Sequence, residues 1–441
     1  MKKKSLTRIL VNNLNRSISS QDRYRASLHF LDWIGCSFLG SKSEVGKIFT
    51  NFYPNLSGGR CSAIGGGLNS VEAATFINGS LGNIFEMDDI HRTSILHPGP
   101  VVIPAALAAA QDIDASYKDF LDSVVLGYET MVRLGQSVGK EHYKFFHNTA
   151  TCGSFGSGIA SGKIYGLNDD QLVNTLGNCG SLIGGLWQMR NENVMTKQLH
   201  NAHAARAGLT SALLAKAGLT GPDFILEGPQ GIYSALCEDA DPDKLNLVED
   251  GVWKIYDTSF KPWAACRHAH PVIDATLNLR EKINFNEIEK VVLKTYQDAV
   301  KFCNKVKPET ILEAKFSLHH VFAVSLIDGP PSLSSFDPDA FNRSDVRTLR
   351  EKTEVQVCDV IEKNYPEHYG AEVIIKLKNN KSINFYQKDA LGDPGNPIND
   401  DAVIQKFKNL MGASQTNYTR INNIIDCVLS LSKNEKLNKL K

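Results

Sequence analysis

The residues with the most evident capacity for chemistry lie at positions 86–100, in the sequence EMDDIHRTSILHPGP. Carboxyl, imidazole and guanidinium groups follow one another here, ahead of an apolar stretch rich in alanine. A histidine beside a carboxylate can move protons near neutral pH, so Asp89 and His97 are the leading acid–base pair. The Pro-Gly-Pro run at 98–100 is expected to prevent a regular helix, so that backbone amides and side chains converge on a ligand. The same groups could bind a metal ion, although nothing nearby completes an obvious ligand set.

Two further clusters stand at expected helix starts. His147 is followed by Thr149 and a glycine-rich run, which suits an anion site at a helix N-terminus or simple capping by the threonine hydroxyl. Lys197 and His200 are three residues apart, so they can share a helix face. A lysine in a closed pocket can neutralise a carboxylate or act as a base, whereas a lone lysine at a helix start is usually a solvated charge.

A fourth cluster, KPWAACRHAHP, occupies residues 261–271. Lys261, Arg267, His268 and His270 give it two cations and two imidazoles. The His-Ala-His spacing suggests a metal pair on a strand, because alternate side chains of a strand share a face. An anion-binding hinge is an equally good interpretation of the same residues.

The last candidates have simpler structural explanations beside the functional ones. His319 and His320 are adjacent before an apolar helix and point in different directions, so at most one should face a pocket. Glu86, Asp88 and Arg92 fit a capped loop whose charges are solvated.

The elements that must position these residues are mostly helical over the first 260 residues. Ser116, followed by Asp119, is a candidate N-cap for one of these helices. Apolar residues at helical spacing or runs rich in small apolar residues predict helices over 23–39, 71–85, 101–110, 115–138, 168–181 and 200–217.

The pattern changes after residue 260. Short β-branched runs at 286–293 and 372–377 predict strands, and Asn379, Asn380 and Lys381 predict a hairpin turn after the second run. The segment GDPGNP then interrupts regular structure before a helical tail. The fold class expected is mainly α, with a large all-helical domain formed by residues 1–260 plus 398–441 and a smaller α+β lid domain at 261–397.

Composition narrows the classes of function. The 441 residues carry 48 Lys plus Arg and 48 Asp plus Glu, and this zero net charge gives no sign of a nucleic-acid partner. No apolar stretch approaches the roughly 20 residues that span a bilayer, so no membrane partner is expected. Nine scattered cysteines without a CxxC pair indicate a reducing, cytoplasmic location. The basic N-terminus faintly resembles a mitochondrial transit peptide, but an amphipathic first helix is the preferred interpretation.

Taken together, the clusters resemble the MmgE/PrpD family, which includes 2-methylcitrate dehydratase, cis-aconitate decarboxylase and iminodisuccinate epimerase. The resemblance implies a large helical domain with a smaller α+β lid, a homodimer, a pocket between the domains, and no required metal or organic cofactor. The segments that carry it, in order along the chain, are MDDIHRTSILHPGPVVIPAALAAA, FHNTATCGSFGSG, MTKQLHNAHAARAGL, GPDFILEG, KPWAACRHAHPVIDA, KFSLHHVFAVSLIDG and GDPGNP.

The resemblance also implies a set of site residues. One position departs from the pattern, because His320 stands where members of the family often carry a tyrosine. By motif position, the pocket residues would be Asp89, Thr93, His97, His147, Lys197, Lys261 and His270.

The expected function is a cofactor-independent lyase similar to 2-methylcitrate dehydratase, which removes a proton next to a carboxylate of a small di- or tricarboxylate. An epimerase or a decarboxylase of the same family is the alternative. His97 is the leading acid–base group, with Asp89 orienting it or sharing the proton transfer. His147 and His270 are second candidates for that role. Lys197 and Lys261 are the other catalytic candidates and, with Arg267, would supply positive charge. The substrate-binding candidates are Thr93, Thr149, His200, Arg267, His270 and His320.

Two hypotheses from other classes compete with this one. A metal-dependent hydrolase would use Asp89, His97, His268 and His270 as ligands. A noncatalytic carboxylate-binding or scaffold protein would bind its ligand without turnover. The hydrolase predicts stoichiometric zinc or manganese and loss of activity with chelator, whereas a binding protein would not need as many ionisable loops as the chain contains.

Overall fold

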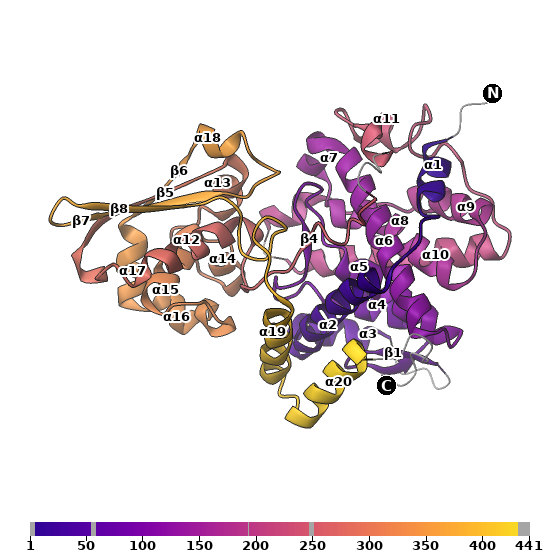
Figure 1. The fold of residues 1–441 in the computed structure, drawn as a ribbon, viewed down its shortest axis with the longest axis horizontal. Helices are drawn as coiled ribbons and strands as arrows, with labels where there is room; N and C mark the ends of the chain where they lie inside the picture. Colours follow the sequence, from indigo (N-terminus) through magenta and orange to yellow (C-terminus); the bar gives the residue numbers. More distant parts are fainter. Residues whose placement is uncertain (1–4, 54–58, 193, 247–250, 431–441) are drawn as a thin grey trace. The chain divides into compact units, whose positions relative to one another are not determined.

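The computed structural model describes residues 5–53, 59–192, 194–246 and 251–430. The chain divides into two compact units, one formed by Met1–Phe260 with Asn399–Lys441 and the other by Lys261–Ile398. Helices dominate the first unit, whereas the four-stranded sheet lies in the second. The mainly α fold class with a smaller α+β portion is therefore confirmed (Figure 1).

The helical unit is built around α8 (Asn148–Ile164), which packs against four other helices. Small residues allow the closest of these contacts. The Ser157 hydroxyl donates to the Ala204 carbonyl at 2.8 Å, and a Cβ on Gly208 would lie 2.0 Å from the Ser157 Oγ. The helices that surround α8 are α5 (Gly99–Asp112), α6 (Tyr117–Ser137), α9 (Asp169–Gly180) and α10 (Thr196–Lys216).

Side-chain caps fix where several of these helices begin. The Ser116 hydroxyl accepts from the backbone N–H of Asp119, as the sequence predicted, and Asn168 caps α9 in the same way. Ser70 caps α4 (Val71–Leu81), and Ser19 caps α2 (Ser20–Lys42). Each such cap is worth about 0.5–2 kcal/mol. Short-range sequence signals therefore set the starts of α2, α4, α6 and α9, whereas α5, α8 and α10 begin without a side-chain cap.

The remaining elements of the helical unit are short. The expected first helix is present as α1, although residues 1–4 of the N-terminal segment lie outside the described residues. These elements are α1 (Leu6–Asn13), α3 (Glu44–Phe52), β1 (Cys61–Ala63), β2 (Gly67–Asn69), β3 (Ile90–His91), α7 (Gly139–Phe145), η1 (Trp187–Asn191), α11 (Ile232–Leu236), η2 (Pro242–Leu245) and β4 (Thr258–Ser259).

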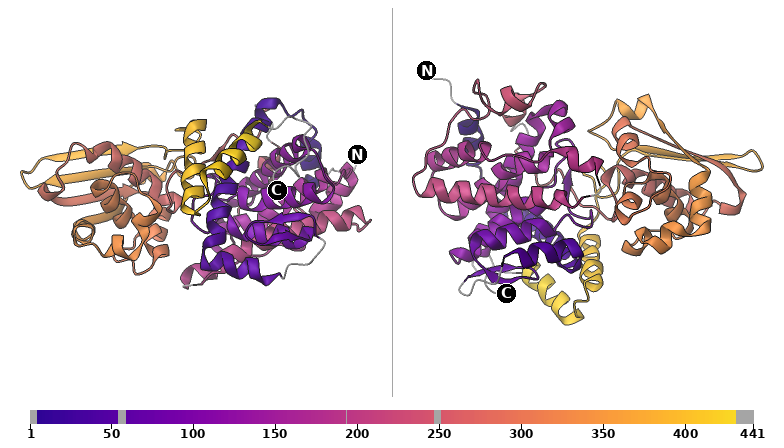
Figure 2. Two further views of the ribbon diagram at one scale, coloured as in Figure 1. Left: turned by 90° about the horizontal axis from the view of Figure 1, so that it is seen from below. Right: turned by 180° about the vertical axis from the view of Figure 1, so that it is seen from behind.

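The C-terminal tail belongs to the helical unit. Both α19 (Asp400–Ala413) and α20 (Tyr418–Ser430) pack against α2 (Figure 1, Figure 2). The helical tail was predicted to residue 431, which lies outside the described residues. Across the described ranges, no helix combines the length and apolar character that crossing a membrane requires.

The α+β unit contains a four-stranded sheet in the order β6-β5-β7-β8. β5 pairs with β6 in parallel and with β7 antiparallel, and β7 pairs antiparallel with β8. The turn between β7 and β8 includes Asn380 at φ 65°, which confirms the predicted hairpin. The strands are β5 (Ile288–Thr295), β6 (Thr353–Val357), β7 (Ala371–Leu377) and β8 (Ser382–Gln387).

Helices cover one face of this sheet (Figure 1, Figure 2). Buried and half-buried residues alternate strictly along β7, as expected for a sheet with one covered face. The helices of this unit are η3 (Arg267–Ala269), α12 (His270–Arg280), η4 (Phe285–Glu287), α13 (Gln297–Cys303), α14 (Ile311–Lys315), α15 (Leu318–Ile327), η5 (Leu333–Phe336), α16 (Pro338–Asn342), α17 (Ser344–Glu351) and α18 (Asp359–Glu362).

The suggestion of a strand through His268 and His270 is wrong. His268 lies in the short helix η3, and His270 is the first residue of α12. Pro271 follows at the start of α12, where a fixed φ and a missing N–H favour helix initiation. Three residues of alternating type were too short a pattern to distinguish a strand from a helix start.

Candidate active site

The loop from Glu86 to His97 contains the short strand β3, which pairs with β4. His91 and Leu96 exchange backbone hydrogen bonds of 2.9 and 3.3 Å, which close the loop on itself. Glu86 and Ile95 have φ values of 59° and 49°, in the left-handed region that costs a non-glycine residue about 1–3 kcal/mol. Such strain is typical of functional loops, where the surrounding contacts hold a backbone that would otherwise relax.

The proline-rich end of the loop does not prevent a helix, contrary to the prediction. Instead, α5 begins at Gly99 with Pro100 in its first turn. The first N–H groups of a helix have no intrahelical partner, so proline is tolerated there. The Gly99 N–H donates to Oδ1 of Asp89 at 2.8 Å, which places a carboxylate at the positive end of α5.

The Asp89 carboxylate is buried and fully engaged. Besides Gly99, its Oδ2 accepts from Nδ1 of His29 at 2.8 Å and from the Tyr128 hydroxyl at 2.6 Å. Burial lowers the pKa of His29 to about 4, so the neutral imidazole is the donor. With three donors on two oxygens, Asp89 fixes the loop against α2, α5 and α6. Its backbone carbonyl, rather than its carboxylate, faces His97.

His97 is held by one ring nitrogen. Its Nδ1 donates to the Asp89 carbonyl at 2.9 Å, which places the proton on Nδ1, and Oδ2 of Asp88 lies 2.8 Å away at ion-pair distance. Within the described part of the chain, Nε2 has no hydrogen-bond partner. The His97 N–H donates to the Thr149 hydroxyl at 3.1 Å, which ties the loop to the first turn of α8. The side chain is 11% exposed, so Nε2 can serve a ligand.

Two more histidines of the helical unit, His147 and His200, lie beside each other. His147 precedes α8, and its Nδ1 is 3.3 Å from Nδ1 of His200, on α10. Burial holds the pKa of His147 well below 6.5, and the charges of Lys197, His200 and His97 lower it further. Burial, with Lys197, also lowers the pKa of His200 to about 4. The Trp187 ring packs 4.4 Å from His147. The structure thus brings His97, Lys197 and His200 each within electrostatic range of His147.

Lys197 stands in the first turn of α10 and forms an ion pair with Glu86. The two side chains are 18% and 5% exposed, so the pair is largely buried but still reaches solvent. Thr93 is half-buried, and its hydroxyl accepts from the Gln136 amide at 2.9 Å. The loop therefore presents a carboxylate to Lys197 at one end and an imidazole at the other.

The remaining predicted residues lie in the α+β unit. Lys261, His270 and His320 are fully buried, and Arg267 is 3% exposed. Arg267 forms an ion pair with Asp393 and approaches Nδ1 of His270 at 3.2 Å. Nε2 of His320 lies 2.8 Å from the Ser335 carbonyl, and burial lowers the pKa of His320 to about 4. A part in substrate binding stays a prediction for all four residues.

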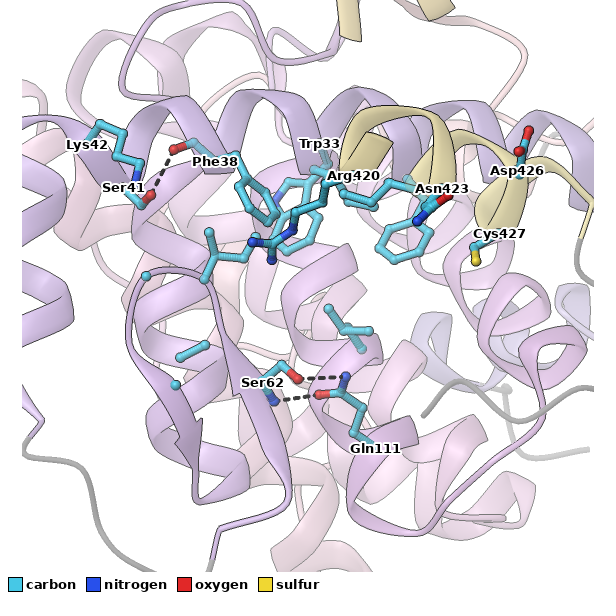
Figure 3. Close-up of a pocket in the computed structure, with 18 residues that line it drawn as sticks. Trp33, Phe38, Ser41, Lys42, Ser62, Gln111, Arg420, Asn423, Asp426 and Cys427 are labelled. Atoms are coloured by element: carbon cyan, nitrogen blue, oxygen red, sulfur yellow. Dashed lines mark hydrogen bonds between the residues drawn. The ribbon is translucent and has the colours of Figure 1, made fainter. Parts of the chain in front are cut away.

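A cavity of about 720 Å³ lies elsewhere in the helical unit (Figure 3). It is bordered by α2, the β1–β2 hairpin, α5 and α20, and none of the predicted site residues lines it. Its walls are mainly apolar, and Gln111 and Ser62 hydrogen-bond to each other at one side. Among the described residues, no three His, Cys, Asp or Glu side chains are grouped so that they could hold a metal ion. The hydrolase hypothesis therefore gains no support.

Buried histidines should make the protein less stable in acid. Burial lowers the pKa of His91 to about 3 and those of His29 and His200 to about 4. Their pKa in the unfolded chain is about 6.5, so below that pH the unfolded state binds protons that the folded state excludes. Each histidine's contribution is full above pH 6.5 and is lost towards pH 4, by up to about 1.4 kcal/mol per pH unit. Urea titrations near pH 7 and pH 5 should show the lower apparent free energy of unfolding at pH 5. Equal values would contradict this prediction.

Sequence reasoning missed several residues that shape the site. His29 and Tyr128 are separated from Asp89 by 60 and 39 positions, and nothing in their local sequence marks them. Nothing in the local sequence marks Trp187 either. Asp88 was recognised as part of the loop, but its charge was predicted to be solvated. Its position next to Asp89 could have indicated a role in the site.

Family models and related proteins match this chain over most of its length. A family model for the MmgE/PrpD N-terminal domain matches residues 4–245, and one for the C-terminal domain matches residues 263–431. The chain is 26% identical to the cis-aconitate decarboxylase-like protein oryM of Aspergillus oryzae, over 94% of this chain and 91% of the relative. It is 27% identical to cis-aconitate decarboxylase of Mus musculus (87% and 81% covered) and 25% identical to that of Aspergillus terreus (93% and 89%). The matches span both units and confirm the resemblance seen in the motifs: the protein is a member of the MmgE/PrpD family.

Proposed function

We propose that the protein is a carboxy-lyase that removes CO2 from a small unsaturated tricarboxylate of the cis-aconitate type. The observation that carries the proposal is His97, with Nδ1 fixed by Asp88 and Nε2 left for a ligand, in a site that also holds Lys197. The relatives named as cis-aconitate decarboxylases favour this reaction over the dehydration expected from the sequence.

The proposed step needs one acid and one or more cations. When the bond to the departing carboxylate breaks, CO2 leaves and the electron pair stays on the substrate, delocalised towards a neighbouring carboxylate. Lys197 neutralises this developing charge, and a preorganised donor of this kind can be worth about 3–4 kcal/mol. Protonated His97 then delivers its Nε2 proton to the carbanion, while Asp88 stabilises the imidazolium. His97 regains a proton from water after the product leaves.

The substrate's other carboxylates need positive or hydrogen-bonding partners. A chain with zero net charge has no general field to attract an anion, so local groups must do so. Burial keeps His147 and His200 neutral near pH 7, so their part would be to exchange hydrogen bonds with the ligand. Lys261, Arg267 and His270 are proposed as further contacts for the substrate, as expected from the motifs.

Asp88→Asn should lower kcat by about 10- to 100-fold. An amide keeps the shape of the carboxylate but cannot stabilise the imidazolium. The loss is smaller than for removing His97, because the Asp89 carbonyl still accepts from Nδ1. Steady-state turnover of cis-aconitate, with near-ultraviolet circular dichroism as the control for folding, measures the effect. Unchanged kcat would remove Asp88 from the mechanism.

We also propose a homodimer, formed through an apolar surface of the helical unit. Phe145 on α7, Leu186 before η1, and Met195 and Leu199 at the start of α10 are large apolar side chains that are 45–65% exposed. Light scattering should give twice the chain mass of 48.6 kDa. A monomer at micromolar concentration would contradict the dimer but not the reaction.

The reaction is tested by a substrate screen followed by proton NMR in D2O. Cis-aconitate, 2-methylcitrate and an iminodicarboxylate separate the decarboxylase, dehydratase and epimerase outcomes. Decarboxylation should give a product with one deuterium at the carbon that lost CO2 or at its allylic partner. Dialysis against a chelator before the assay tests the expected cofactor independence. Dehydration or epimerisation without CO2 release would replace the proposed reaction with the alternative observed.

A further inference from the structure

A buried lysine on the C-terminal helix contacts the loop of the candidate active site. Lys406, on α19, forms a 2.5 Å ion pair with Oδ1 of Asp32 on α2, and the two side chains are 5% and 2% exposed. The same ammonium group donates to the backbone carbonyl of Met87. Met87 immediately precedes Asp88, so this contact lies one residue from the carboxylate that holds His97.

The charges around Lys406 explain why it stays protonated despite its burial. Burial alone would lower its pKa, but the negative charges of Asp32 and of neighbouring groups including Asp88 outweigh that and raise it. For Asp32 the balance is reversed: burial, with repulsion from Asp88 and Asp89, raises its pKa to about 6 although Lys406 opposes the shift. Lys406 is thus the counterion of a cluster of buried carboxyl groups.

A buried ion pair of this kind adds little to stability. The cost of removing two charges from water offsets most of their attraction, and replacing such a pair by uncharged groups is often neutral or stabilising. Removing one partner alone is strongly destabilising, because the other charge is left buried. The net effect of the Lys406–Asp32 pair is therefore mainly geometric: it fixes a donor opposite the Met87 carbonyl.

That donor acts on the part of the loop where geometry matters most. The peptide after Met87 carries Asp88, and the next residue supplies the Asp89 carbonyl, the second acceptor of the His97 Nδ1 proton. The Asp89 carboxylate is anchored separately by His29, Tyr128 and Gly99. The loop is thus held on both sides of Asp88, whose Oδ1 also accepts from the Asn83 amide at 2.6 Å, and Lys406 provides one of these contacts.

We propose that Lys406 is a positioning residue, which holds the Met87 peptide so that Asp88 and the Asp89 carbonyl align His97, and that Asp32 holds Lys406 for this task. The kinetic consequence rests on the proposed function, because it assumes that His97 transfers the proton. The structural consequence does not: without Lys406 the loop should open more often, whatever reaction the site performs.

The test uses the full chain and three variants, Lys406→Met, Asp32→Asn and the double variant. Lys406→Met should lower both the melting temperature and kcat, the latter by about 10- to 100-fold, because misplacements near 1 Å can cost that much. KM should change less than about threefold, since the substrate contacts remain. Asp32→Asn keeps the donor to Met87. It should therefore lower the melting temperature, while its kcat should fall less than that of Lys406→Met.

The double variant separates positioning from stability. Removing both charges leaves no unpaired ion, so its melting temperature should recover towards that of the wild type, whereas kcat should stay as low as in Lys406→Met. Recovery of kcat together with the melting temperature would show that Lys406 acts only on stability, and would overturn the proposal.

Hydrogen exchange measured by mass spectrometry tests the loop without any substrate. Peptides that cover residues 86–97 should exchange faster in Lys406→Met and in the double variant than in the wild type. Arg133→Met is the matched control, because Arg133 is a buried cation of the same unit whose polar contact among the described residues is with Glu129. Its loop peptides should exchange at the wild-type rate.

The kinetic and hydrogen-exchange measurements test the proposed function and the positioning role separately. If wild-type protein does not turn over any of the screened carboxylates, the proposed function fails, and the exchange data still decide the positioning role. If turnover is found but the loop exchanges equally in Lys406→Met and Arg133→Met, the positioning role is wrong while the reaction stands.

Discussion

His97→Gln should reduce kcat by about 10²–10⁴, the range that general acid–base catalysis contributes. Glutamine keeps a polar side chain near Asp88 but cannot carry a proton to the substrate. Burial lowers the pKa of His147 and that of His200, so neither of these neighbours should supply the proton in its place. Stopped assays of CO2 release from cis-aconitate, or from whichever carboxylate the screen identifies, measure the loss.

The matched control for this substitution is His203→Gln. His203 lies on α10, is half-buried, and has its Nε2 3.0 Å from the Leu182 carbonyl, so the same change there should leave kcat within about twofold. Circular dichroism and the melting temperature of both variants should resemble the wild type. Near-normal turnover of His97→Gln would exclude it as the acid, and a collapsed fold would show that its contact with Asp88 is structural.

Lys197→Met should lower kcat by about 10²–10³, corresponding to the loss of one preorganised donor in a water-poor site. The methionine side chain has a similar length and no charge, so packing at the start of α10 is largely kept. A second effect works against the variant, because Glu86 would lose its cationic partner and would repel an anionic substrate. Both kcat and kcat/KM should therefore fall.

Two further variants identify the cause. Lys216→Met makes the same change on the same helix, at an exposed residue beside the Tyr165 ring, and should leave kinetics unchanged. Lys197→Met combined with Glu86→Gln removes the repulsion as well. If the double variant regains only KM, Lys197 stabilises the transition state. If it regains kcat too, the single variant failed because of Glu86, and Lys197 does not neutralise the charge that develops on the substrate.

The sequence by itself determined the local elements and the positions of the reactive groups. Helix ends depend on residues within one turn, so Ser116 and Asn168 could be identified as caps or boundaries without knowledge of the fold. The strands β5 and β7 and the turn at Asn380 followed from β-branched runs and turn residues in the same way. Histidine, lysine and carboxyl groups clustered ahead of helix starts marked the loop at 86–97 and the starts of α8 and α10.

Only the tertiary structure decided which groups became partners. A buried charge must be paired, but packing determines by what: Asp89 by His29 and Tyr128, and His97 by Asp88 rather than by the Asp89 carboxylate. Lys406 reaches a carbonyl 319 positions away, because α19 packs on α2 beside the loop. Such contacts depend on the approach of distant helices, which leaves no pattern in the sequence near either residue. The sequence therefore predicted which residues could react, and the packing of α2, α6 and α19 determined the partner of each reactive group.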